Sequence, residues 1–365
     1  MPKRDIPEEN GTRLQKTILI LFALSLVVFL VSRFFPSEEG KAIREEMLRA
    51  SRVMEEATAA LGKCQQERGL VFDRDSDPNQ TGLIGLDLSP ITTSLGSLEA
   101  KRTTTNPNFA ALVVFLLKEA GVKRGDTIAV GASSSFPALI VALLSASKAM
   151  NLNPLLICSL GASQWGANHP DFHWLDMQDC LLEQGIFDFH PIALSLGGER
   201  DTGEDMSGEG RSFLRERIEA SGIFFLYEPD LQKNVETRMR LYEREATEDS
   251  IKAFVNIGGS WSNMGEDSLV LKIKPGNVKT REIPPPEKRG VLFEMAAREI
   301  PVIHLLYIKG LVDRYGFDWD PVPLPRPGHG QIYQLIKERD PGFLLLSGIY
   351  FFLLLLILLF RSRLR

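Results

Sequence analysis

The sequence predicts an α/β protein in which helices cover both faces of a mainly parallel sheet, with a transmembrane helix before and after that domain. In the middle of the chain, short apolar runs without polar alternation recur between helical segments, which is typical of strands buried on both faces. Long uncharged apolar segments occupy both ends. With 44% hydrophobic and 24% charged residues, the composition is that of a globular protein rather than of a disordered one.

The first elements are a short tail, residues 1–16, and a predicted transmembrane helix, residues 17–35. Thr17 to Ser32 contain no charge, and no small-residue cleavage site follows them, so the sequence favours an uncleaved anchor over a signal peptide. Near the other end, residues 341–360 include eighteen uncharged residues in a row. Eighteen helical residues span about 27 Å, which is close to the hydrocarbon thickness of a bilayer.

The basic residues in the tails predict the orientation of both spans. Residues 1–16 carry four Lys or Arg, and the C-terminal tail, residues 361–365, carries three arginines, so the positive-inside rule places both tails in the cytoplasm. Four further basic residues follow the first span closely, and the C-terminal arginines therefore decide the orientation. The domain between the spans is then extracytoplasmic.

Residues 38–68 are predicted to form an amphipathic helix. Its apolar residues are spaced alternately by four and three positions, which is a heptad-like seam: Ile43, Met47, Ala50, Met54, Ala57, Leu61 and Cys64. The seam either packs on the domain or pairs with a second copy in a homodimer. Docking on the domain is favoured, because alanine and methionine are weak seam residues and three heptads are few.

Residues 81–320 are predicted to form the α/β domain, in a Rossmann-like arrangement, and residues 321–340 a proline-rich linker. The predicted strands are 126–130, 154–158, 192–196 and 253–257, with weaker strands at 269–273 and 302–306. The predicted helices are 109–120, 136–150, 174–184, 211–220 and 231–245. Because strands and helices alternate along the chain, the sheet is expected to be parallel.

Cysteine is scarce in the chain. The three thiols are Cys64, Cys158 and Cys180, and no C-x-x-C motif is present. Three thiols cannot all pair within one chain, so disulfide stapling is not expected. Cys158 lies in an apolar run, where a small buried hydrophobe is the expected role.

The net charge and the motifs exclude several classes of ligand. The two tails and Arg33 carry +5, so the remainder of the chain carries −10 where the whole has a formal charge of −5. Such an acidic domain is a poor nucleic-acid binder. The chain contains no P-loop and no dinucleotide-binding glycine motif after a strand, and none of its His, Cys and Asp groups completes a metal-ligand spacing. No cofactor and no metal site are therefore expected.

Small polar loops that contain glycine and serine follow three of the predicted strands, and they predict a ligand-binding cleft. Ligands bind at the carboxyl ends of parallel strands, where such loops meet. The candidate ligand-binding residues in these strands and loops are Ser134, Ser163, Trp165, Asn168, Asn256 and Ser260. Capping of the next helix is the structural alternative for any single serine, but three such loops on one sheet edge favour the cleft.

A polar segment ahead of the first predicted domain helix suggests a small anion receptor. Lys101 and Arg102 lie among hydroxyl groups, including those of Thr93 and Thr103, just before that helix begins. Cations and a helix N-terminus both favour a carboxylate ligand. A solvated turn with a helix cap at Asn106 is the alternative.

A serine nucleophile is a further prediction at the first glycine–serine loop. Gly131 to Ser135 approaches the G-x-S-x-G nucleophile elbow, with Ser133 in the nucleophile position and Ser135 where the last glycine should stand. Either serine is therefore a candidate nucleophile. The segment HPDFH and the residues after it offer a base and an orienting carboxylate: His169 or His173, with Asp171 or Asp176. Of these, His173 is the predicted base and Asp176 the predicted orienting carboxylate.

Four longer segments resemble the bacterial poly-gamma-glutamate system protein family: SPITTSLGSLEAKRTTTNPNFAALVV, AVGASSSFPALIVALLSA, SLGASQWGANHPDFHWLDM and VNIGGSWSNMG. The likeness runs from about Thr81 to Gly265, and the two-anchor layout also fits the family. The resemblance implies an accessory protein of the bacterial cytoplasmic membrane that serves the synthesis or export of this capsule and exopolymer. It supplies no known activity and no assigned catalytic residues.

Two functions are consistent with the residues and with the resemblance. In the first, the extracytoplasmic domain binds the anionic polymer or the membrane subunits of its synthase through the polar cleft at the carboxyl ends of the strands, and the basic spot at Lys101 and Arg102 beside these loops receives a carboxylate. In the second, the domain is a serine hydrolase or transferase that acts on γ-glutamyl amide bonds through Ser133 or Ser135.

Overall fold

A six-stranded sheet forms the centre of the domain, which spans residues 43–335. The computed structural model describes residues 19–28, 38–71, 73–246, 251–336, 345 and 347–353. The strands in spatial order are β5 (Ala193–Ser195), β2 (Asn153–Ser159), β1 (Thr127–Ser133), β6 (Phe254–Ile257), β8 (Val302–Leu305) and β7 (Gly276–Asn277). All neighbouring pairs are parallel except β7 and β8. The predicted α/β class with a mainly parallel sheet is confirmed.

The order of the strands reverses between β1 and β6. From β1 the chain proceeds outward through β2 to β5, and it then returns to the other side of β1 to form β6 and β8. The loops that follow β1 and β6 consequently leave the sheet in opposite directions. Such a reversal opens a crevice at the carboxyl ends of the two central strands, which is where open parallel sheets bind ligands.

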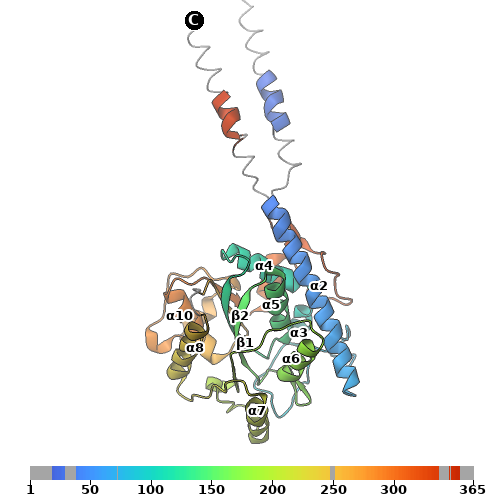
Figure 1. Ribbon diagram of the computed structural model, residues 1–365, viewed down its shortest axis with the longest axis vertical. Coiled ribbons are helices and arrows are strands. Elements are labelled where there is room, and N and C mark those ends of the chain that lie inside the picture. Colours follow the sequence, from blue (N-terminus) through green and yellow to red (C-terminus); the bar gives the residue numbers. More distant parts are fainter. Residues whose placement is uncertain are drawn as a thin grey trace, which may run out of the picture. The chain divides into compact units, whose positions relative to one another are not determined.

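Helices cover both faces of this sheet. The helices that follow α2 (Glu38–Glu67) are α3 (Leu98–Thr104), α4 (Asn108–Glu119), α5 (Pro137–Met150), α6 (Trp174–Glu183), α7 (Gly208–Ser221), α8 (Leu231–Glu245), α9 (Trp261–Met264), α10 (Val291–Ala297) and α11 (Ile308–Tyr315). Figure 1 shows α8 and α10 on one side of β1 and β2, with α4 and α5 on the other. The central strands are buried on both faces for this reason, which explains why their sequences are apolar without alternation.

The core between the sheet and α8 and α10 depends on alternate residues of the strands. Ala129 of β1, Leu155 and Ile157 of β2 and Phe254 of β6 point to this side and are almost completely buried. They belong to one apolar cluster with the fully buried Tyr242 of α8, whose hydroxyl donates to the β1 carbonyl of Val130 at 2.8 Å. A tyrosine can be buried here because its polar atom finds a backbone partner.

The helix predicted at 38–68 is present as α2 (Glu38–Glu67), and its seam is buried. Met47, Ala50, Met54, Ala57 and Leu61 are fully inaccessible within the single chain. These residues pack on the domain, as the docked-helix alternative states, and the seam offers no free apolar surface for pairing with a second copy.

A disulfide links Cys64 of α2 to Cys180 of α6, with the two Cα atoms 6.5 Å apart. The prediction that disulfides play no part was therefore wrong. The two cysteines are separated by 116 positions, and only the docking of α2 on the domain brings them together. Cys158 is the buried free thiol that the sequence predicts.

Two segments after α8 differ from the prediction. The weak strand expected at 269–273 is a 3-10 helix, Ser268–Lys272, because the Asp267 carboxylate accepts a hydrogen bond from the Leu269 amide at 2.9 Å and starts a helical turn. Residues 321–335 of the predicted linker lie on the domain: the hydroxyl of the buried Tyr333 contacts the Ser51 hydroxyl at 2.8 Å.

The ends of the chain form a separate unit, to which residues 19–28, 345 and 347–353 contribute helical turns. Within it, Ser25 and Tyr350 share a hydrogen bond between their hydroxyl groups. The predicted tails lie outside the described residues, as does most of the predicted spans at 17–35 and 341–360. Among the residues with described structure, no helix is both long and apolar enough to cross a bilayer.

A buried ion pair fastens the loop after β5 to α8. Asp201 and Arg238 are almost completely buried, and Arg238 Nη2 lies 2.7 Å from Asp201 Oδ2. The Asp201 carboxylate also accepts hydrogen bonds from the Ser195 hydroxyl at 2.7 Å and from the Asn234 amide at 3.0 Å. Because every partner is satisfied, the pair holds this loop in one conformation at the carboxyl edge of the sheet.

We expect Asp201→Ala to lower the free energy of unfolding by about 3–5 kcal/mol, because it leaves the Arg238 guanidinium buried and unpaired. Urea denaturation of the full chain measures this change. Arg200→Ala is the matched control: it removes a half-exposed partner of Glu266 and should change stability by about 0.5 kcal/mol or less. Equal effects of the two substitutions would contradict the assignment.

Candidate functional site

A pocket of about 240 Å³ lies at the carboxyl ends of the central strands, and we refer to it as the switch-point pocket. Its wall is rich in hydroxyl groups, which come from the segment before α3 and from the loops and ends of the parallel strands: Thr93, Ser94, Ser133, Ser135, Ser159, Ser163 and Ser260. Phe136 and the half-exposed Trp261 add two aromatic rings. The predicted cleft is therefore present where the strand order reverses.

Several predicted ligand-binding residues lie near the pocket but do not line it. The Ser134 hydroxyl donates to the Ser159 carbonyl at 2.6 Å. The buried Asn168 amide binds both backbone groups of Leu86, and Thr103 Oγ1 donates to the Glu99 carbonyl.

The remaining two predicted residues also serve the fold. Trp165 donates its backbone N–H to the Leu86 carbonyl. The buried Asn256 side chain donates to the Gly258 carbonyl and lies 2.9 Å from His304 Nδ1. These groups hold backbone segments together without capping a helix. The capping alternative applies to Ser260, whose hydroxyl accepts the Asn263 N–H at the start of α9.

The anion receptor predicted at Lys101 and Arg102 does not form. Both residues lie inside the short helix α3, which ends at Thr104 before α4 begins at Asn108. The Arg102 guanidinium forms a two-point ion pair with Asp320, in which Nε lies 2.7 Å from Oδ1, and its third nitrogen donates to the Asp75 carbonyl. This pairing raises the pKa of Arg102 and occupies the charge that a ligand would need.

Lys101 lies beneath the switch-point pocket and joins two of its loops. Its side chain is 3% exposed, and Nζ donates to the Ser163 hydroxyl at 2.8 Å and to the Ser135 carbonyl. The same nitrogen lies 3.7 Å from the centroid of the Phe136 ring. Among the residues that the structure describes, no carboxylate pairs with this amine, and burial lowers the pKa of Lys101 to about 7.

The predicted Ser–His arrangement is not assembled. The hydroxyls of Ser133 and Ser135 are hydrogen-bonded to each other at 3.0 Å. His173 instead begins α6: its Nδ1 accepts the Leu175 N–H, while Nε2 faces Arg217 at 3.2 Å.

Asp176, the predicted orienting carboxylate, has a structural role as well. It accepts the His173 backbone N–H and pairs with Arg68 and Arg217. Burial lowers the pKa of His173 to about 4, and in the described part of the chain no hydrogen bond joins this ring to a serine. The helix cap explains the HPDFH segment without catalysis.

Asp205 is a pocket residue that the sequence analysis missed. It comes from the loop after β5 and is the ionisable group on the pocket wall. Desolvation is the main cause that raises the pKa of its carboxyl group, and the nearby Glu199 and Glu204 add to the shift. The Gly197–Gly198 pair after β5 marks a glycine-containing loop of the same kind as the three loops predicted to form the cleft.

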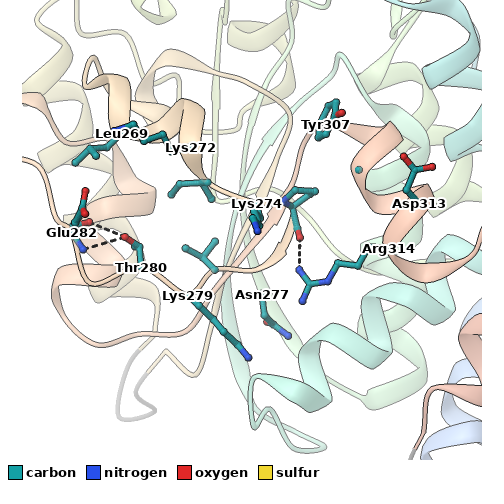
Figure 2. Close-up of a pocket in the computed structure, with 14 residues that line it drawn as sticks. Leu269, Lys272, Lys274, Asn277, Lys279, Thr280, Glu282, Tyr307, Asp313 and Arg314 are labelled. Carbon is teal, nitrogen blue, oxygen red and sulfur yellow. Dashed lines mark hydrogen bonds between the residues drawn. The ribbon is translucent and has the colours of Figure 1, made fainter.

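A second and larger hollow, of about 940 Å³, lies beside β7 and α11, and we call it the basic groove. Figure 2 shows four cationic side chains around it, namely Lys272, Lys274, Lys279 and Arg314. None of the three lysines has a carboxylate partner among the described residues. The acidic residues on its wall are Glu282 and Asp313, and Asp313 is already paired with Lys309.

Tyr307 presents an aromatic ring at the rim of the basic groove (Figure 2). The ring is 65% exposed, and the residue has a left-handed backbone with φ of 62°, which costs about 1 kcal/mol or more for a non-glycine residue. A Cβ at Gly310 would lie 2.5 Å from this ring. Glycine at 310 therefore permits the tyrosine to lie against α11.

Comparisons with known proteins give no name to either site. No protein-family model, no curated protein and no solved structure matches the chain. The chemistry of the two hollows therefore rests on their own residues.

The lowered pKa of Lys101 predicts a specific dependence of stability on pH. Between pH 7 and about 10 the unfolded chain binds a proton at this amine that the folded chain does not, so the free energy of unfolding should rise with pH, by up to about 1.4 kcal/mol per unit. Below pH 7 both states are protonated and the contribution is constant. Lys101→Met removes the group and should remove this rise.

Chemical denaturation of the full chain from pH 6 to 10 measures the difference between the two proteins. Lys123→Met, at an exposed position, is the control and should retain the rise of the unaltered protein. Parallel curves for the unaltered protein and Lys101→Met would show that the buried amine does not titrate in this range.

Proposed function

We propose that the chain is a membrane-anchored, extracytoplasmic accessory component of poly-gamma-glutamate synthesis or export, and that it binds the anionic polymer through the basic groove. One observation carries the proposal: three lysines without carboxylate partners and Arg314 surround a single hollow in an otherwise acidic domain. The resemblance of four segments to the poly-gamma-glutamate system family supplies the biological context. The membrane subunits of the synthase are the partners that this context implies.

The charge distribution favours the basic groove over the switch-point pocket as the polymer site. The net negative charge of the domain repels a polyanion on average. A hollow lined by cations creates a local positive potential that attracts it. The groove measures about 940 Å³, whereas the pocket measures about 240 Å³ and its ionisable wall residue is Asp205. A chain that carries regularly spaced carboxylates is complementary to the groove alone.

The disulfide supports the extracytoplasmic placement of the domain. Disulfides persist in secreted and cell-surface proteins, whereas cytosolic thiols are kept reduced. The Cys64–Cys180 bond joins two helices, and disulfides typically stabilise a domain by about 2–4 kcal/mol. Together with the uncharged segments at both ends, it favours anchors at the membrane and an oxidising compartment.

The alternative is a serine hydrolase or transferase that acts on γ-glutamyl amide bonds through Ser133 or Ser135. Neither hydroxyl has a base within hydrogen-bond distance among the described residues. The two serines are bonded to each other instead, so this form of the alternative is the weaker proposal.

Charge reversal in the groove should abolish polymer binding. We expect Lys272→Glu/Lys274→Glu/Lys279→Glu to weaken the binding of poly-γ-glutamate at least tenfold at 50 mM salt and to flatten its salt dependence, because three favourable charges become unfavourable. Titration of the full chain in detergent with labelled polymer measures both effects.

Lys123→Glu/Lys233→Glu/Lys288→Glu is the control, since it changes the net charge equally at exposed lysines away from the groove. It should retain the affinity within about twofold. Equal losses in both triple variants would show that overall charge, rather than the groove, governs binding.

The disulfide gives an independent test of the compartment. Cells are denatured in acid, and the free thiols are then labelled with a maleimide that adds a measurable mass. We expect one label per chain, at Cys158, and three labels after reduction. Three labels without reduction would contradict an extracytoplasmic domain.

A further inference from the structure

We propose that Ser163 and Lys101 are a nucleophile and its general base for acyl transfer in the switch-point pocket. Ser163 lines the pocket, and its hydroxyl lies 2.8 Å from Lys101 Nζ. An amine at this distance can accept the proton of the hydroxyl directly. The inference does not depend on the polymer or on the basic groove.

The surroundings of Lys101 suit a neutral amine. Such an amine has two N–H donors and one lone pair, and Nζ has three neighbours: the Ser135 carbonyl, the face of Phe136 and the Ser163 hydroxyl. In the ammonium form Nζ donates to the Ser163 hydroxyl. Once the amine is uncharged, the carbonyl and the ring face can accept its two N–H groups, and the bond to Ser163 reverses so that the lone pair accepts the hydroxyl proton.

The charged neighbours of Lys101 are engaged elsewhere. On its own helix, Glu99 accepts a hydrogen bond from Ser97 and Arg102 pairs with Asp320. On α11, which packs beside α3, Asp313 pairs with Lys309, and Arg314 donates to the Pro275 carbonyl. Desolvation is the cause that lowers the pKa of the Lys101 amine to about 7, so that a large fraction of it is uncharged at neutral pH.

Ser163 differs in this respect from the other serines of the pocket. Ser133 and Ser135 bind each other, and the Ser159 hydroxyl lies 3.4 Å from the Ala132 carbonyl. In the part of the chain with described structure, Ser163 is the pocket serine whose hydroxyl contacts an amine. Gly259 lines the same pocket, and its backbone N–H has no hydrogen-bond partner among the described residues, so it is a candidate donor to an oxyanion.

The reaction balances with water as the co-reactant. Lys101 Nζ takes the Ser163 proton as Oγ attacks the carbonyl carbon of an ester or amide. The bond to the leaving alcohol or amine then breaks, and the ammonium returns its proton to that group. Water next attacks the acyl-serine, with the same amine as base, to release the acid and restore the Ser163 hydroxyl.

The pocket walls define the class of acyl group. At about 240 Å³ the pocket accommodates a small group, and hydroxyls with the rings of Phe136 and Trp261 line it. Asp205 repels a carboxylate on the substrate and attracts an amine. The substrates are therefore small esters or amides whose acyl part is uncharged or carries an amine.

The test treats the full chain in detergent with p-nitrophenyl acetate and locates the acetyl group by peptide mass spectrometry after an acid quench. We expect acetylation of Ser163 and at least a 100-fold slower reaction in Ser163→Ala. Lys101→Met should slow it similarly while leaving Ser163 in place. Acetylation of another pocket serine, or none, would overturn the proposal.

If Lys101→Met does not fold, the pH dependence of Ser163 acetylation in the unaltered protein still tests whether Lys101 is the base. The rate of Ser163 acetylation should increase about tenfold per pH unit up to about pH 7 and then level off, as the amine loses its proton. A rate that rises steadily to pH 10 would contradict the proposal, because it would show that the reactive group has a pKa well above that of the buried Lys101 amine. Ser207→Ala, at the start of α7, is the control and should react like the unaltered protein.

Discussion

The buried amine of Lys101 is the contact on which the switch-point pocket depends. The side chain rises from α3 and binds the loop after β1 at Ser135 and the loop after β2 at Ser163. The parallel sheet brings these two loops to one edge, and the amine fixes the distance between them. Burying an amine without a carboxylate is costly, and here the cost is moderated by a hydroxyl, a carbonyl and the face of Phe136.

The switch-point pocket and the basic groove are chemically opposite, and this difference follows from where charges are paired. In α3, the Arg102 guanidinium is paired with Asp320, and the Lys101 amine is buried under the pocket. The polar groups on the pocket wall are therefore hydroxyls and the Asp205 carboxyl group. Beside β7, Lys272 ends the 3-10 helix and Lys274 and Lys279 lie before and after the strand, and none of the three has a carboxylate partner among the described residues. One hollow therefore suits a small uncharged or amine-bearing group, and the other suits an anionic chain.

The sequence predicts the parts of this protein that depend on local pattern. Apolar runs identify the central strands, and the rule that ligands meet the carboxyl ends of parallel strands places Ser133, Ser163 and Ser260 correctly in one pocket. The roles of Arg102 and Cys64 escape prediction because their partners are 218 and 116 positions away. No periodicity encodes such contacts, since they exist only after the elements have docked. His173 was predicted as a catalytic base but caps α6. The sequence does not separate the two roles, because the same ring nitrogens serve both.

The chemistry at Lys101 also bears on why this residue is a lysine. A tie between two loops needs only a donor for the Ser135 carbonyl and a partner for the Ser163 hydroxyl, and a neutral amide provides both without the desolvation cost of an amine. A lysine amine, unlike an amide, can accept the Ser163 proton and return it, and this function offsets the cost of its desolvation. Perturbed ionisable groups concentrate at functional sites for the same reason. The structural tie and the proposed base are thus one contact, in which the loops position the amine and the amine activates the serine.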